Sequence, residues 1–138
     1  MYLRLRGGPF TRNMFLEIET ITDHSILPCD SVKYDPENKL VTMMIWRYPL
    51  KTTKVRFLRF LGSKRDKSIE IKSRVTIRNI EECIMEHNFG LLQVTLLFGV
   101  GVRGNTVFVT SAEESSGMIG FRVTMTVSEL DLEIEDIE

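Results

Sequence analysis

Residues 91–112 read LLQVTLLFGVGVRGNTVFVTSA, and this stretch indicates the fold more clearly than any other part of the chain. Its apolar residues alternate with small or polar ones, which is the side-chain period of a β-strand. One apolar face is predicted to consist of Leu92, Val94, Leu96, Phe98, Val100 and Val102. The pair Gly104-Asn105 is typical of a two-residue hairpin turn, so we expect TVFVTSA to form the returning strand.

The glycines of this stretch match the spacing G-x-G-x-x-G, at Gly99, Gly101 and Gly104. A dinucleotide-binding turn needs a helix directly after its glycines, so that the pyrophosphate meets a helix N-terminus. Here the strand pattern continues through the glycines and a turn follows, which argues against a nucleotide site. We therefore expect the glycines to allow a bend in the sheet or the close approach of another backbone.

Alternation recurs in residues 14–21, 69–78 and 118–127, and we interpret all three segments as strands. The ambiguous run KVRFLRFL at 54–61 is also predicted to be a strand. Turn signals separate these runs at 34–39, 62–68 and 113–117. The sequence therefore predicts an all-β fold, an antiparallel β-barrel or β-sandwich of about eight to nine strands.

One segment has the period of a helix instead, and we predict one short helix near residues 79–88. Its apolar stripe at i, i+3, i+4 and i+7 consists of Ile80, Cys83, Ile84 and His87. Asn79 is a favourable N-cap, and Glu82 follows it three residues later, as in a capping box.

Length and composition indicate one soluble domain spanning residues 1–138, with residues 128–138 as an acidic C-terminal strand or arm. The chain is 43% hydrophobic and 27% charged, which is ordinary for a globular protein. It has no apolar run of the roughly 18 residues that span a membrane, and its first residues, MYLRLRGGPF, lack the apolar region of a signal peptide. We therefore expect a cytoplasmic protein with no membrane span.

Charge is strongly segregated along the chain. Residues 47–78 carry 11 basic and 2 acidic side chains, a net charge of +9, whereas residues 79–138 carry 2 basic and 11 acidic ones, a net charge of −9. Such segregation says more about partners than about fold. The basic block is expected to bind an anionic partner through Arg56, Arg59, Lys64, Arg65, Lys67, Lys72 and Arg74.

The acidic end alternates as well and is expected to form an assembly arm through Leu130, Asp131, Leu132, Glu133, Ile134 and Glu135. These residues complement the basic block in sign. Within one molecule the two regions would be cross-strand neighbours, and between molecules they would meet head to tail. The partner is therefore expected to be another protein or a second copy of the chain, and the chain a self-assembling homo-oligomer in the second case.

The functional hypothesis is a non-enzymatic interaction or assembly module that uses the basic face and the acidic arm. One alternative is a nucleic-acid-binding domain, in which the same cations contact phosphates beside aromatic side chains. A further alternative is a small-ligand-binding barrel. Its cavity would be lined by Met43, Met44, Trp46 and Tyr48.

The four remaining candidates for chemistry are His24, Cys29, Cys83 and His87. If the fold brought them together they would make a Cys2His2 zinc site, or a Cys–His pair for nucleophilic catalysis. Their spacing includes no C-x2-C knuckle, and a buried free cysteine commonly acts as a small hydrophobe. We therefore predict no metal, no cofactor and no catalytic residues, and two cysteines are too few for a disulfide framework.

Overall fold

The computed structural model of the protein describes residues 1–49, 69–87, 94–111 and 121–137. These ranges contain ten strands, one α-helix and one short 3-10 helix. In chain order the elements are β1 (Tyr2–Arg6), α1 (Arg12–Thr22), β2 (Ile26–Pro28), η1 (Cys29–Ser31), β3 (Lys33–Asp35), β4 (Leu40–Arg47), β5 (Ile71–Ile77), β6 (Ile80–His87), β7 (Val94–Arg103), β8 (Thr106–Ser111), β9 (Phe121–Val127) and β10 (Asp131–Asp136).

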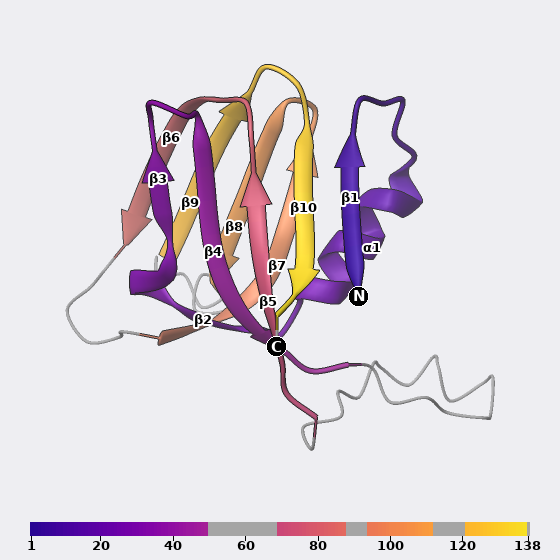
Figure 1. The fold of residues 1–138 in the computed structure, drawn as a ribbon, viewed down its shortest axis with the longest axis vertical. Helices are drawn as coiled ribbons and strands as arrows, with labels where there is room; N and C mark the ends of the chain where they lie inside the picture. The colour runs from indigo at the N-terminus through magenta and orange to yellow at the C-terminus, as the bar shows by residue number, and fades with distance from the viewer. Residues whose placement is uncertain (50–68, 88–93, 112–120, 138) are drawn as a thin grey trace.

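All neighbouring strands are antiparallel, in the order β1-β10-β5-β4-β2-β7-β8-β9-β6, with β3 also paired to β4. The strands form two layers: β3, β4, β5, β10 and β1 make one, and β6, β9, β8 and β7 make the layer behind it (Figure 1). The short β2 pairs with both β4 and β7 and so joins the layers. The predicted all-β antiparallel fold with one short helix is confirmed.

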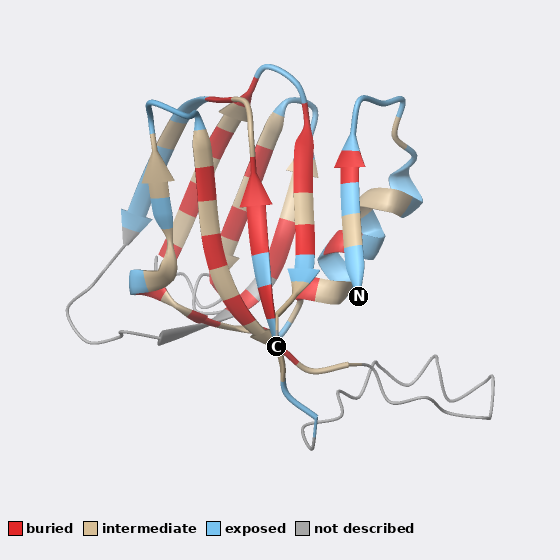
Figure 2. Ribbon diagram, viewed as in Figure 1, coloured by how far each residue is buried: buried red, intermediate tan, exposed pale blue. Residues whose placement is uncertain are grey.

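The core lies between the two layers. Alternate residues of β4 and β9 are buried, and the buried bands in Figure 2 mark the inward side of each strand. The largest completely buried side chains of these two strands are Met43, Ile45 and Met125. A period of two along each strand therefore places one apolar face against the core and leaves the other face outward.

The helix lies elsewhere than predicted. Residues 80–87 form β6, which pairs with β9, so the predicted helix at 79–88 is wrong. The residues 14–21 that were predicted to be a strand belong to α1. Pairing with β9 overrides the apolar stripe, and a register shift between Ile80 and Glu82 brings Cys83 opposite Met125.

The residues of α1 fit both periods, because MFLEIETI alternates and also carries an apolar stripe. Thr11 is the N-cap, and its hydroxyl accepts a hydrogen bond from the backbone N–H of Met14 at 3.3 Å. Ile18 and Thr22 lie one turn apart on the same face and are both completely buried. The helix thus begins at a capping signal and buries one narrow stripe.

The glycines of β7 allow α1 to lie directly against the strand. A Cβ atom at Gly99 would lie 3.1 Å from the Thr22 Oγ1 atom and 3.2 Å from the Glu19 carbonyl oxygen. The Thr22 hydroxyl accepts a hydrogen bond from the Val100 N–H at 2.8 Å and donates one to the Ile18 carbonyl at 2.8 Å. The prediction that a glycine of this stretch permits the close approach of another backbone is confirmed for Gly99, whereas an added Cβ atom at Gly101 would meet only the Glu19 side chain.

The apolar face of β7 is not continuous, which corrects the predicted alternation. The register of β7 against β8 shifts between Leu97 and Gly99. As a result Leu97 and Val100, three residues apart, are both buried. A bulge of this kind turns the strand and changes which residues face the core.

Two of the predicted turns lie within the described residues. Both are confirmed, and one needs a correction. Gly104 and Asn105 join β7 to β8, and Gly104 has a φ of 60°, as the first position of a type II′ turn requires. In the β3–β4 turn, Asp35 accepts hydrogen bonds from the Asn38 backbone and side chain, which lower its pKa. The sequence favours Asn38 for the left-handed position of this turn, because asparagine tolerates a positive φ, but the residue with positive φ is Lys39, at 52°. The predicted strand at 54–61 and the predicted turns at 62–68 and 113–117 lie outside the described residues.

Replacing Gly99 by alanine is expected to lower the free energy of unfolding by about 3 kcal/mol, because a methyl group would meet helix backbone at a φ of 139°. Chemical denaturation measures this change. Gly104→Ala is the matched control, because it has positive φ and nothing within 4 Å of an added Cβ. It should cost only about 1 kcal/mol. Equal losses in the two variants would contradict the proposed close approach.

Candidate anion-binding surface

The outward faces of β1, β10, β5 and β4 together form one charged surface. β10 lies between β1 and β5, with Arg4 opposite Glu133 on one side and Thr76 opposite Glu133 on the other. β4 follows on the far side of β5, with Trp46 opposite Lys72. This surface has two regions that differ in how their cations are paired.

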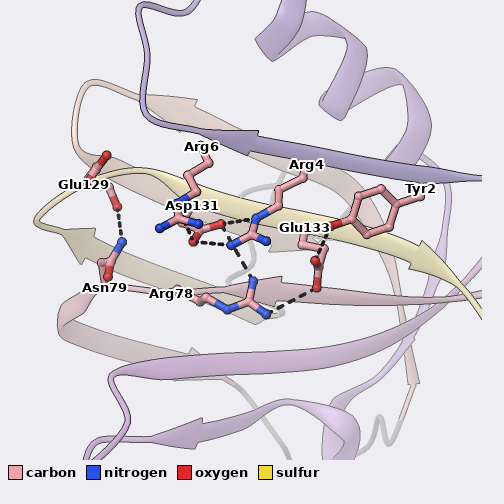
Figure 3. A network of polar contacts seen from close by, with 8 residues as sticks. All are labelled: Tyr2, Arg4, Arg6, Arg78, Asn79, Glu129, Asp131 and Glu133. Carbon is pink, nitrogen blue, oxygen red and sulfur yellow. Dashed lines mark hydrogen bonds and ion pairs between the residues drawn. The ribbon is translucent and has the colours of Figure 1, made fainter.

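The region around β10 is neutralised by ion pairs within the chain (Figure 3). The Arg4 guanidinium donates two hydrogen bonds to the Asp131 carboxylate, at 3.0 and 2.9 Å. Arg78 donates to Glu133 at 3.4 Å, and the Tyr2 hydroxyl donates to the same carboxylate at 2.6 Å. Three strands that are far apart in sequence are therefore joined by one polar network.

The network holds its carboxylates in the charged form. The Arg4 hydrogen bonds lower the pKa of Asp131, although burial of this carboxylate opposes the shift. The Tyr2 hydroxyl and the charge of Arg78 lower the pKa of Glu133 against a similar opposition. Both groups are therefore more acidic in the folded chain than in the unfolded one.

A second polar cluster lies where β4 and β10 end. There the inward positions of β4, β5 and β10 carry polar side chains. Asp136 accepts hydrogen bonds from Arg47 at 2.8 Å, from Ser73 at 2.7 Å and from the Met1 ammonium group at 2.7 Å. Burial raises the pKa of Asp136, but these three donors together outweigh it and leave the pKa lowered. The cluster ties β10 to three other segments of the chain.

The acidic C-terminal residues are thus engaged within their own molecule. Of the two arrangements considered for residues 128–138, the structure shows the one in which the acidic strand is a cross-strand neighbour of basic residues. β10 pairs on both sides, so neither of its edges is open to a second copy. Three of the predicted arm residues are in the core: Leu130, Leu132 and Ile134.

The other region of the surface is a groove beside β4 that contains cations only partly matched by acids. Trp46 and Met44 line it from β4, Lys72 and Arg74 from β5, and Lys33 from β3. Its volume is about 400 Å³. The Lys72 ammonium lies 5.4 Å from the centre of the Trp46 ring, within the range of a cation–π contact.

The wall of the groove is held in place by η1. The Ser31 hydroxyl accepts a hydrogen bond from the Met44 N–H at 3.2 Å and donates one to the Pro28 carbonyl at 2.7 Å. This contact fixes η1 against β4 and places Asp30 at the rim. Because β3 pairs with β4 in the register Lys33 to Thr42, Lys33 reaches the same groove.

The groove cations have no close acidic partner in the part of the chain that the structure describes. Within the described ranges no carboxylate lies within 4 Å of Lys33, Lys72 or Arg74, and all three side chains are exposed. Glu135 is opposite Arg74 in register but forms no such pair. Among the described residues that line the groove, Asp30 is the one acidic residue. The groove therefore has a positive local charge.

Two of the seven predicted anion-binding residues, Lys72 and Arg74, line this groove. The other five lie outside the described residues: Arg56, Arg59, Lys64, Arg65 and Lys67. Sequence reasoning did not include Lys33 in this site. The signal for it was the turn at 34–39, which folds β3 back along β4 and so brings Lys33 beside the groove.

The residues considered for a ligand cavity point in opposite directions. Met43 borders the outer groove but is completely buried in the core, whereas the partly exposed Met44 and Trp46 lie on the outward face of β4 and line the groove. Tyr48 donates a hydrogen bond to Glu70 at 3.1 Å, just beyond the ends of β4 and β5. Because these side chains do not share one face, they do not line a common interior cavity.

The cysteines and histidines do not gather into a described metal site. Cys29 is buried in η1 beside β4, and Cys83 is half-buried on β6 in the other layer. Burial raises the pKa of Cys83. The His24 Nδ1 atom lies 2.9 Å from Asp23, and His87 is the last residue of β6. In the part of the chain that the structure covers, no three His, Cys, Asp or Glu residues are placed to share a metal ion.

Comparisons with protein-family models, with curated proteins and with solved structures return no match for this chain. Among the described segments, α1 is the one α-helix, and no helix there has the length and apolar character needed to cross a bilayer. The functional inference therefore depends on the geometry of the charged surface.

The carboxylate network makes stability sensitive to acid. Asp131, Glu133 and Asp136 have lowered pKa values in the folded chain, so protonation favours the unfolded state. Their stabilisation is complete above the pKa values of the unfolded chain, about 4, and is lost as pH falls through the lower folded values. Thermal unfolding followed between about pH 7 and pH 2 should therefore show a steep loss below about pH 4.

Asp131→Asn is expected to lower the free energy of unfolding at pH 7 by about 1–3 kcal/mol, because a nearly buried charged acceptor is lost. The variant should also lose less stability than the wild type between neutral and acidic pH. The exposed Glu135 on the same strand provides the control, Glu135→Gln. An Asp131→Asn variant with an unchanged acid transition would contradict this account of the network.

Proposed function

We propose that the chain is a binding module that holds an acidic segment of a partner protein in the groove beside β4. The observation that carries the proposal is the contrast between the two regions of one surface. Around β10, Arg4 and Arg78 are matched by carboxylates of the chain itself. In the groove, Lys33, Lys72 and Arg74 have no described carboxylate within 4 Å.

The chemistry of the groove favours a polypeptide with both acidic and apolar side chains. Trp46 and Met44 offer apolar surface between the cations, and the rim is rigid because η1 is bonded to β4. Carboxylates would gain ion pairs with cations that are otherwise solvated, and buried apolar contacts would add affinity. Exposed charges of this kind steer association more than they fix its strength, so binding should weaken with salt.

Binding of single-stranded nucleic acid is the second candidate, because a tryptophan beside three cations could contact bases and phosphates. The contact between Lys72 and the Trp46 ring favours the polypeptide instead. The ammonium group lies over the ring that a stacked base would need. The rim carboxylate of Asp30 would also repel a phosphate.

Trp46 is the single tryptophan of the chain, so its fluorescence reports directly on the groove. We expect a peptide of alternating glutamate and leucine to change this fluorescence at low salt. The double variant Lys72→Glu with Arg74→Glu should weaken binding by about tenfold or more, equivalent to about 1.4 kcal/mol. The titration is repeated with a thymidine oligonucleotide of similar net charge.

The control is Arg12→Glu with Arg103→Glu, which makes the same change in net charge on exposed residues away from the groove. This variant should bind the peptide nearly as well as the wild type. Equal losses in both double variants would show a response to net charge alone and would refute the groove. Binding of the oligonucleotide but not of the peptide would favour the nucleic-acid alternative.

A further inference from the structure

The two strands at the ends of the strand order have an edge with no described partner strand, as does the short β3, which pairs only with β4. β1 is paired on one side, with β10, and β6 is paired on one side, with β9. Each end of the strand order therefore has an edge that is not paired with a described strand. An open edge presents backbone N–H and C=O groups that can add a strand from another chain.

The outward backbone groups of β1 follow from its pairing. The Asp136 N–H donates to the Met1 carbonyl at 3.0 Å, so Met1 is in a hydrogen-bonded pair with β10. In an antiparallel ladder such pairs recur at every second residue. The backbone groups of Tyr2, Arg4 and Arg6 therefore face away from β10, toward the open edge.

The same reasoning applies to β6. The Ser128 N–H donates to the Asn79 carbonyl at 3.0 Å, whereas the Val127 N–H donates to Asn105 on the β8 side. The even-numbered residues of β9 therefore bond toward β6, and Thr124 is opposite Ile84. As a consequence the backbone groups of Cys83 and Met85 face the open edge.

The outward side chains on the two edges are opposite in charge, although Arg4 and Arg6 also contact Asp131 within the chain, and Glu86 contacts Arg122 at 3.4 Å. On its outer face β1 carries Tyr2, Arg4 and Arg6, and β6 carries Glu82, Ile84 and Glu86. On the inner face β1 carries Leu3 and Leu5, and β6 carries Cys83 and Met85. Ile84 and Met85 point to opposite faces of β6, yet they are 46% and 39% exposed, so this edge leaves apolar area open on both sides.

We propose that the β6 edge binds the β1 edge of a second copy of the chain, as a parallel strand. In a parallel pair, a residue whose N–H and C=O groups point toward the partner strand lies opposite a residue whose N–H and C=O groups point away from it. Parallel pairing therefore places Arg4 and Arg6 on the same face as Glu82 and Glu86. An antiparallel pair would instead place the arginines beside the apolar Met85.

The same charges oppose pairing between identical edges. Two β1 edges would bring arginines together, and two β6 edges would bring glutamates together. Opposite edges attract each other, so the contact is head to tail. Such a contact repeats from copy to copy and produces a closed ring or an open filament.

Light scattering at chain concentrations up to about 0.5 mM, at low and high salt, tests the assembly. The wild type is expected to self-associate at low salt and to dissociate as salt screens the arginine–glutamate contacts. Met85→Pro removes an N–H that faces the open edge and bonds no strand of its own molecule. It should therefore block association while keeping the thermal transition close to that of Met85→Ala, the matched control that retains the N–H.

A charge exchange tests which edges meet. The variant Glu82→Arg with Glu86→Arg and the variant Arg6→Glu should each associate more weakly than the wild type when alone, because each adds like-charge contacts between the two edges. Mixed in equal amounts they should associate more strongly than either alone, since β1 of the first variant and β6 of the second keep the original opposite charges. Arg6 suits this exchange because its side chain is 67% exposed.

A wild type that stays monomeric at low salt would overturn the proposal. So would association that Met85→Pro leaves intact, or a mixture of the two charge variants that associates no more strongly than either variant alone. The groove variant Lys72→Glu with Arg74→Glu should assemble like the wild type, because β4 and β5 are interior strands. Failure of peptide binding and failure of assembly are therefore separate results.

Discussion

The contact between α1 and β7 is the constraint on which the arrangement of the two layers depends. Gly99 has no side chain, so helix backbone can lie where a Cβ atom would otherwise be. The Thr22 hydroxyl then bonds the Val100 N–H, which the bulge in β7 would leave unpaired. The helix thus satisfies the strand at the point where the sheet bends, and the bend brings β7, β8, β9 and β6 behind the other layer (Figure 1).

Sequence reasoning predicted the class of the fold because several strands alternate cleanly, as β8 and β9 do. It failed where a segment fits two periods. MFLEIETI alternates, but the N-cap Thr11 and the buried pair Ile18 and Thr22 favour a helix. Residues 80–87 carry a helical stripe, but they form a strand that pairs with the edge of β9. In both segments tertiary contacts, which the local sequence does not reveal, determine the secondary structure.

The charged site was predictable only in part, for a related reason. The segregation of charge pointed correctly to Lys72 and Arg74 as outward residues, but net charge per segment does not show which cations are already paired. Arg78 belongs to the same basic block and is matched by Glu133, more than fifty residues later in the chain. Only the order of the strands separates neutralised cations from those that remain available to a partner.

The pairing of β1 with β10 also has a consequence for how the chain folds during its synthesis. Tyr2 and Glu133 bond across 131 residues, so during synthesis β1 has no described partner strand until β10 has also emerged from the ribosome. Contacts of such long range slow the search for the native state. During that interval β1 exposes the same unpaired edge that a neighbouring nascent chain could recognise, and its arginines discourage pairing with identical strands.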